Sequence, residues 1–300
     1  MGIIWWVASM VNGASLLLLY GAALFLASLL GSGLPRLLRM THNRTQMVLS
    51  LISGLMLGVA LLHLIPHAFV AAGAIDTVMI WTLSGLIFML LLLRWFHFHQ
   101  HDFASAAADC DLTSPDEHHH AHAHDHAHLP EQAMGAIGLF AGLCVHTVVD
   151  GIALGAVLIG AVTGATLAGV GVFLAILLHK PLDALSIETV MGARGWSSFS
   201  RWSAAIVFAL LCPLTAALFY FGATSLAPHE GLLPAALAFA AGAFICIALG
   251  DLLPEVQFHS HDRLKLTLLF LLGVGIAFVL GFNGTRTLSD ASGVNRAGAP

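Results

Sequence analysis

The chain has 300 residues, of which 58% are hydrophobic and 9% are charged, and its formal net charge is -5 at pH 7. A water-soluble core cannot bury that much apolar surface, whereas apolar runs of about 18 residues or more are typical of membrane-spanning helices. There is no basic tail or patch to bind nucleic acid, and the 4 Cys include no CxxC pair, which argues against a disulfide framework and a thiolate zinc site.

Eight apolar segments are long enough to cross a bilayer, and they must be helical because backbone amides in lipid bond internally. They cover residues 12–34, 46–72, 78–97, 133–160, 164–192, 202–226, 232–256 and 264–283. We therefore predict an all-α integral membrane protein with eight transmembrane helices in a single transmembrane domain, residues 1–300. A long loop, residues 98–131, follows the third span, and residues 284–300 are predicted to be a disordered tail.

The positions of Lys and Arg predict the orientation. Most of the 11 basic residues fall on one side of an eight-span arrangement: Arg36, Arg39, Arg44, Arg94, Arg194, Arg201, Arg263 and Lys265. The positive-inside rule then places the long loop in the cytoplasm and both termini outside. We expect the protein in a cell membrane, taken as a bacterial inner membrane.

The fourth and fifth spans each contain a His followed four residues later by an Asp: His146 with Asp150, and His179 with Asp183. Residues i and i+4 share a helix face, and both His lie roughly 21–22 Å from the outer ends of their spans. Because the two spans are antiparallel neighbours, the pairs can converge and offer two imidazoles and two carboxylates to zinc or another divalent metal. A purely structural role is the alternative, but each ionisable group costs about 2.5–3.5 kcal/mol at mid-membrane, which argues against two duplicated pairs.

Other polar residues in the spans are further candidates. Met56 and His63 share a predicted helix face in span two and could complete or relay a metal site, although Met56 could equally pack as an apolar side chain. Asp251 in span seven is another candidate ligand, and Glu188 is either an exit ligand or part of a solvated helix end. Lys180 lies deep in span five and needs a carboxylate partner, for which we expect Asp251.

The long loop is rich in histidine. Residues 97–128 hold ten of the 18 His of the chain, with Asp and Glu between them, so the loop cannot form a packed core and is predicted to be disordered and metal-binding. The His that we expect to capture metal are His118, His119, His120, His122, His124, His126 and His128. Importers and exporters both carry such loops, so the loop does not fix the direction of transport.

Three stretches, LLHLIPHA, HTVVDGIALGA and IALGDLLPE, together with the eight spans and the His-rich loop, resemble the ZIP (Zrt/Irt-like) family of divalent metal transporters. The resemblance implies a ZIP-like bundle, in which we expect helices 2, 4, 5 and 7 to lie inside, and a metal site between spans four and five. A second ion of the family would use the positions of Thr147, Lys180 and Asp251. Because an ammonium group has no lone pair for a metal, Lys180 predicts a single-metal site and acts as the second-site cation.

The predicted function is secondary transport of Zn²⁺, or of Cd²⁺, Fe²⁺ or Mn²⁺, toward the cytoplasm, with no enzymatic activity and no organic cofactor. The expected partners are the metal ions and the lipid bilayer, with a homodimer left open. One alternative is a cation-diffusion-facilitator exporter, although that family has six spans and a soluble domain. Another is a membrane zinc hydrolase, in which His63, His146, His179 and Asp150 would hold a zinc-bound water, although HExxH is absent.

Overall fold

The structure is a computed structural model that describes residues 13–37, 42–95, 129–162, 166–225, 231–252 and 263–294. The elements in these residues are all helical: α2 (Gly13–Leu37), α3 (His42–Val59), η1 (Ala60–Leu64), α4 (Ile65–Ala72), α5 (Ile75–Trp95), α7 (Leu129–Val162), α8 (Thr166–Ala193), α9 (Ser198–Ser225), α10 (Leu232–Ile247), η3 (Ala248–Leu252) and α12 (Arg263–Val294). Within the described residues, 7 helical spans are long and apolar enough to cross a membrane, and Leu264–Leu280 is a shorter apolar helix. The predicted all-helical membrane fold is confirmed.

Helix ends differ from the predicted spans at two places. α12 continues to Val294, so helical backbone covers residues 284–294 of the segment that was predicted to be a tail. α7 begins at Leu129, inside the predicted loop, and Pro130 lies in its first turn, where a missing N–H costs no helical hydrogen bond. The His of the long loop lie outside the described residues.

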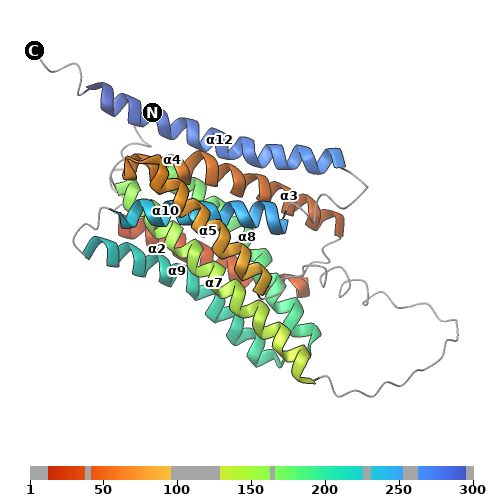
Figure 1. The fold of residues 1–300 in the computed structure, drawn as a ribbon. Helices are drawn as coiled ribbons and strands as arrows, with labels where there is room; N and C mark the ends of the chain where they lie inside the picture. The colour runs from red at the N-terminus through yellow and green to blue at the C-terminus, as the bar shows by residue number, and fades with distance from the viewer. Residues whose placement is uncertain are drawn as a thin grey trace, which may run out of the picture.

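The helices form two groups that pack mainly within themselves (Figure 1). We call α2, α7, α8 and α9 the site group, and we call α3–η1–α4, α5, α10–η3 and α12 the flanking group. The groups meet where α10 contacts α7 and where α3 and α12 contact α8. In Figure 1, α12 lies along one edge of the bundle beside α3, its main partner.

The inner and outer helices differ in how much of each span is buried. The spans of α3–α4, α7 and α10 are 67% buried and that of α8 is 44% buried, compared with 28% for α2 and α5 and 33% for α9. This order confirms the prediction that helices 2, 4, 5 and 7 lie inside. The outer helices expose large apolar side chains such as Leu18, Leu30 and Leu218, as expected for surfaces that face lipid.

Glycine allows α3 and α12 of the flanking group to approach closely. A Cβ on Gly54 would overlap the carbonyl oxygen of Phe270, and a Cβ on Gly273 would overlap that of Leu51. Two helix backbones can reach this separation only with small residues at the contact, which is a common arrangement in membranes. The two glycines therefore allow α12 to pack closely against the inner span that it covers.

Two spans of the flanking group are interrupted by a π-helical turn, η1 in span two and η3 in span seven. Pro66 follows η1 and cannot donate a backbone hydrogen bond, so regular helical bonding is lost around it. At the start of η3, the Ala248 carbonyl accepts a hydrogen bond of 2.8 Å from Ser53 Oγ of α3. In η1 the His63 carbonyl instead accepts a hydrogen bond of 2.6 Å from His67 Nδ1 of the same span, so only the η3 carbonyl is satisfied by a contact between helices.

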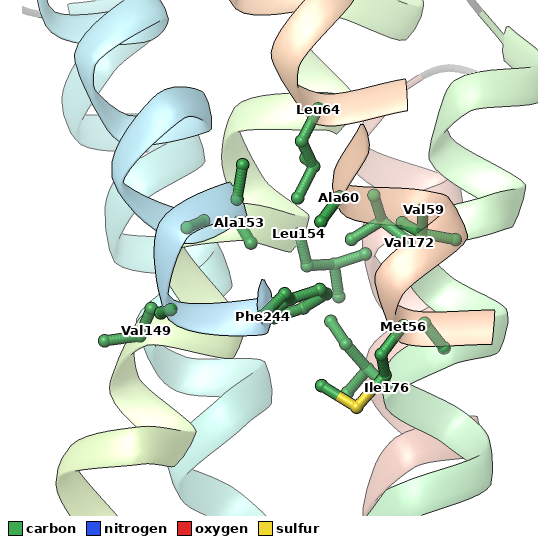
Figure 2. Packing of buried hydrophobic residues seen from close by; sticks show 14 of the residues in the cluster. Met56, Val59, Ala60, Leu64, Val149, Ala153, Leu154, Val172, Ile176 and Phe244 are labelled. Carbon is green, nitrogen blue, oxygen red and sulfur yellow. The ribbon is translucent and has the colours of Figure 1, made fainter. Parts of the chain in front are cut away.

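The main hydrophobic core lies between the two groups. Figure 2 shows Met56 of α3, Leu154 of α7, Ile176 of α8 and Phe244 of α10 within one cluster, and all four side chains are fully buried. Large apolar side chains from four helices fix the relative positions of α7 and α8. The charged residues of these two helices are held in place by this packing.

Candidate metal centre

The first half of the site lies on α7. His146 and Asp150 are one helical turn apart, and His146 Nε2 is 3.4 Å from Asp150 Oδ2. Just after Asp150, a Cβ on Gly151 would overlap Thr215 Oγ1 of α9, so the glycine lets α7 pack closely against that helix. His146 and Asp150 lie about 140° and 100° around α7 from this contact, on the part of the helix that faces α8.

The second half lies on α8 and repeats the spacing. His179 Nδ1 lies 2.8 Å from the Ala175 carbonyl oxygen, which can only accept a hydrogen bond, so Nδ1 carries the proton. In the neutral ring, Nε2 then presents its lone pair, and it lies 3.8 Å from Asp183 Oδ2. The backbone bond therefore orients the ring as metal-binding histidines are commonly oriented.

The two pairs converge between the antiparallel helices. One ligand atom from each of His146, Asp150, His179 and Asp183 lies within 4.8 Å of every other. Asp150 Oδ2 is central, because it is 3.3 Å from His179 Nε2 and 3.4 Å from His146 Nε2. Two imidazole nitrogens and two carboxylate oxygens are a ligand set that suits zinc and related divalent metals.

Burial differs among the four side chains. Asp150 is 0% exposed, His146 and His179 are 5% and 4% exposed, and Asp183 is 17% exposed. Among the described residues, His146 Nδ1 and Asp150 Oδ1 are buried without a hydrogen-bond partner. Buried polar atoms are rarely left unpaired, so the site retains unused capacity to bind a ligand.

Lys180 is fully buried beside the four candidate ligands. Its Nζ lies 2.5 Å from Asp150 Oδ2, 3.0 Å from Thr147 Oγ1 and 3.4 Å from Asp183 Oδ2. The sequence predicted Asp251 as the partner, whereas the structure pairs Lys180 with Asp150 and Asp183; the side chain of Asp251 lies outside the described part of the chain. Asp183 lies one turn after Lys180 on α8, and the packing of α7 against α8 brings Asp150 to the ammonium.

Met56 and His63 lie outside this four-residue group. Seven residues make almost two turns of a regular α-helix, which predicts a shared face, but the π-turn η1 adds about one residue to its turn and rotates His63 away. His63 Nε2 lies 2.8 Å from the Ala277 carbonyl oxygen of α12, and the ring lies against Gly171 of α8. Met56 packs in the core shown in Figure 2.

Glu188 also lies apart from the group. At about 100° per residue, nine residues place it about 180° around α8 from His179. Its Oε1 is 3.3 Å from Arg201 Nη1 of α9, and its side chain is 8% exposed, so it is not part of a solvated helix end. The pairing with Arg201 and the pairing of Lys180 with Asp150 both depend on contacts between helices.

One residue at the site was not found from the sequence. The centroid of the Phe208 ring on α9 lies 5.2 Å from Lys180 Nζ, which is a cation–π contact beside the ion pairs of the ammonium. The chain has 18 Phe, most of them in apolar runs, and nothing in the local sequence distinguishes this one.

Comparison with known proteins gives one family match over most of the chain. Residues 14–281 match the family model described as "ZIP Zinc transporter". The match begins in α2 and ends in α12, so it includes both helix groups and all four residues of the candidate site.

Curated relatives match over a smaller part. The chain is 36% identical to "Zinc transporter ZIP9-B" of Xenopus laevis over 144 residues, which is 45% of this chain and 46% of that protein. It is 35% identical to "Zinc transporter ZIP9" of Micropogonias undulatus over 127 residues, 41% of this chain and 40% of that protein. The chain thus spans less than half the length of these relatives. Both are vertebrate proteins and give no support to a bacterial membrane.

Proposed function

Since the chain belongs to the ZIP zinc transporter family, we propose that it carries divalent transition metal ions across a membrane toward the cytoplasm. Zn²⁺ is the first candidate, because the matched relatives are named zinc transporters, and Cd²⁺, Fe²⁺ and Mn²⁺ follow because the same ligand types accept them. The observation that carries the proposal is the convergence of two imidazoles and two carboxylates between α7 and α8.

The four ligands have distinct roles in the proposed path. The ion binds His146, Asp150, His179 and Asp183, and it leaves past Asp183, the most exposed of the four. Asp183 also lies nearest the C-terminal end of α8, which the predicted topology places toward the cytoplasm. On the other side, Met56 and His63 are proposed to guide the ion inward, because His63 borders α8 about 12 Å before His179, at Gly171.

The proposed site holds one ion at a time. With neutral imidazoles, two carboxylates and one ammonium leave the empty site with a single net negative charge. One divalent ion reverses that charge, and a second would add two more positive charges in a fully buried place next to Lys180. Burial of uncompensated charge is expensive, so the second ion is excluded.

Transport requires the site to open first to one side and then to the other. We propose that the site group moves as a unit against the flanking group, in an elevator-like or rocking movement. The division supports this, because α7 and α8 pack more extensively with α2 and α9 than with the flanking helices. Both candidate ligand pairs then move together and keep the ion bound.

Residues 1–300 form one transporter domain in a cell membrane, with both termini outside and the His-rich loop capturing metal in the cytoplasm. The protein is proposed to be a transporter and not an enzyme, and to use no organic cofactor. Assembly as a homodimer is compatible with this proposal. The family match favours this function over an exporter of the cation-diffusion-facilitator type and over a membrane zinc hydrolase.

Flux in proteoliposomes tests the proposal. Purified full-length protein is reconstituted, and the flux of Zn²⁺, Cd²⁺, Mn²⁺ and Fe²⁺ is measured in both directions, with and without a pH gradient. We expect saturable flux of Zn²⁺ at least. Folded, reconstituted protein that moves none of the four ions would overturn the proposed function.

A further inference from the structure

We infer that the Lys180 ammonium is a tethered competitor of the transported ion for Asp150, which weakens ion binding and speeds ion release. This inference rests on the proposed function and adds to it how the affinity of the site is set. Three observations carry it: the oxygen that the ammonium contacts, the burial of that contact, and the groups that surround the ammonium.

The ammonium contacts the same oxygen that faces both imidazoles. Asp150 Oδ2 lies 2.5 Å from Lys180 Nζ, 3.3 Å from His179 Nε2 and 3.4 Å from His146 Nε2. A zinc ion bonded to a carboxylate oxygen lies about 2.0–2.2 Å from it. An ion held by Oδ2 and the imidazoles would therefore lie close to the ammonium and be repelled by it.

Burial makes this repulsion strong. Lys180 and Asp150 are both 0% exposed, so water does not screen the ammonium from an ion in the site. The interaction of two charges increases as the effective dielectric constant falls, and a divalent ion doubles it. The ion can bind Asp150 Oδ2 at full strength only when the ammonium shifts away from that oxygen.

The pocket offers the displaced ammonium other partners. Thr147 Oγ1 donates its hydrogen to the Leu143 carbonyl over 2.7 Å, so its lone pairs are free to accept from Lys180 Nζ, 3.0 Å away. The Phe208 ring provides a second favourable contact. Lys180 can thus move off Asp150 without losing every partner, and it can return when the ion leaves.

A different role for Lys180 predicts that the ion affinity changes in the opposite direction when the ammonium is removed. If the ammonium only oriented Asp150, as hydrogen bonds commonly orient metal-binding carboxylates, then removing it would weaken ion binding. If it competes, removing it tightens binding and slows release. The sign of the change in affinity therefore decides between the two roles.

The test compares purified full-length wild type with Lys180→Gln. Zn²⁺ affinity is measured by competition with a chelator, and the maximal Zn²⁺ flux is measured in proteoliposomes. We expect the Kd of Lys180→Gln to fall about tenfold or more, and its maximal flux to fall as well, because a buried positive charge beside the ion is gone. The control Thr189→Val on the same helix keeps every charge and removes only a hydroxyl that bonds to the Leu185 carbonyl, and its Kd is expected to stay within about threefold of wild type.

A second pair of measurements protects against a folding defect. Lys180→Met serves if Lys180→Gln is not monodisperse, since a Met side chain suits the apolar side of the pocket at Phe208. In Lys180→Ala, added methylammonium should weaken Zn²⁺ binding, whereas it should leave wild type unchanged. An equal or higher Kd in the substituted proteins, with wild type binding and transporting Zn²⁺, would overturn this inference alone. A wild type that neither binds nor transports the four ions would overturn the proposed function.

Discussion

The site group and the flanking group accommodate buried polar atoms in opposite ways. In the site group, α7 and α8 bury Asp150, Lys180 and two imidazoles around a shared oxygen. Among the described side chains of the flanking group, the buried polar ones are Gln46, Ser50, Ser53, His63 and Thr82, and none of these is a carboxylate or an ammonium. Ser50 Oγ donates to the Leu266 carbonyl over 2.6 Å, and Ser53 and His63 bond to other carbonyls in the same manner.

The two kinds of buried side chain have different roles, one in connecting helices and the other in binding an ion. Neutral side chains that bond to backbone carbonyls join α3 to α12 and to η3, which makes the flanking group one firmly connected unit. Charged side chains concentrated on α7 and α8 form a place that a cation can enter and leave. Substitutions in the site group should therefore change ion binding, whereas those in the flanking group should change stability.

The largest expected effect is loss of uptake on removing a ligand from the site group. His179→Ala or Asp183→Ala each deletes one of the four converging groups, so Zn²⁺ uptake in proteoliposomes should fall to the protein-free background while the protein stays monodisperse. The control is Ser186→Ala, which removes only a hydrogen bond to the Leu182 carbonyl on the same helix. Near-normal uptake by both ligand variants would show that the ion binds elsewhere.

The next effect concerns how many ions the site group holds. Lys180→Glu replaces a positive charge with a carboxylate between Thr147 and Asp150, so the number of bound Zn²⁺ ions per chain should rise from one to two. Equilibrium dialysis with metal analysis measures this ratio. If it stays at one, then Lys180 is not what excludes the second ion.

A smaller effect is expected from adding a methyl group to the close contact between α3 and α12 in the flanking group. Gly273→Ala should lower the unfolding free energy by about 1–3 kcal/mol, since its Cβ has no room beside α3, and the melting temperature in detergent should fall accordingly. Gly275→Ala on the same helix is the matched control, because a Cβ there meets nothing within 4 Å. Uptake per folded protein should remain at the wild-type level in both. Equal melting temperatures would show that α12 adjusts easily.

The smallest effect is expected outside both groups. Deleting residues 110–128 removes the run from His118 to His128, which we propose to capture metal in the cytoplasm. The deletion should leave the maximal uptake unchanged and shift only the ion concentration at half-maximal rate, because the four ligands on α7 and α8 are retained. Complete loss of uptake would place the loop in the transport path.

Much of the fold follows from local sequence properties. Apolar runs longer than the bilayer is thick must be helical in lipid, so the spans could be located from residue type alone. The HxxxD spacing fixes that His146 and Asp150 share one face of α7, because that depends only on the 3.6-residue turn. The helical end of α12 at Val294 was not predicted, since its polar residues resemble those of a disordered tail.

The sequence by itself determined where the apolar spans lie, and that His146 with Asp150 and His179 with Asp183 each share a helix face. The tertiary structure decided what each buried group faces: Lys180 lies against Asp150 and Asp183, Glu188 faces Arg201, and the π-turn η1 directs His63 toward Ala277. The physical reason is the distance along the chain over which each kind of interaction acts. Helix geometry relates residues within a few turns, whereas the pairing of buried charges and the interruption of a helix depend on side chains and carbonyls that only packing brings together.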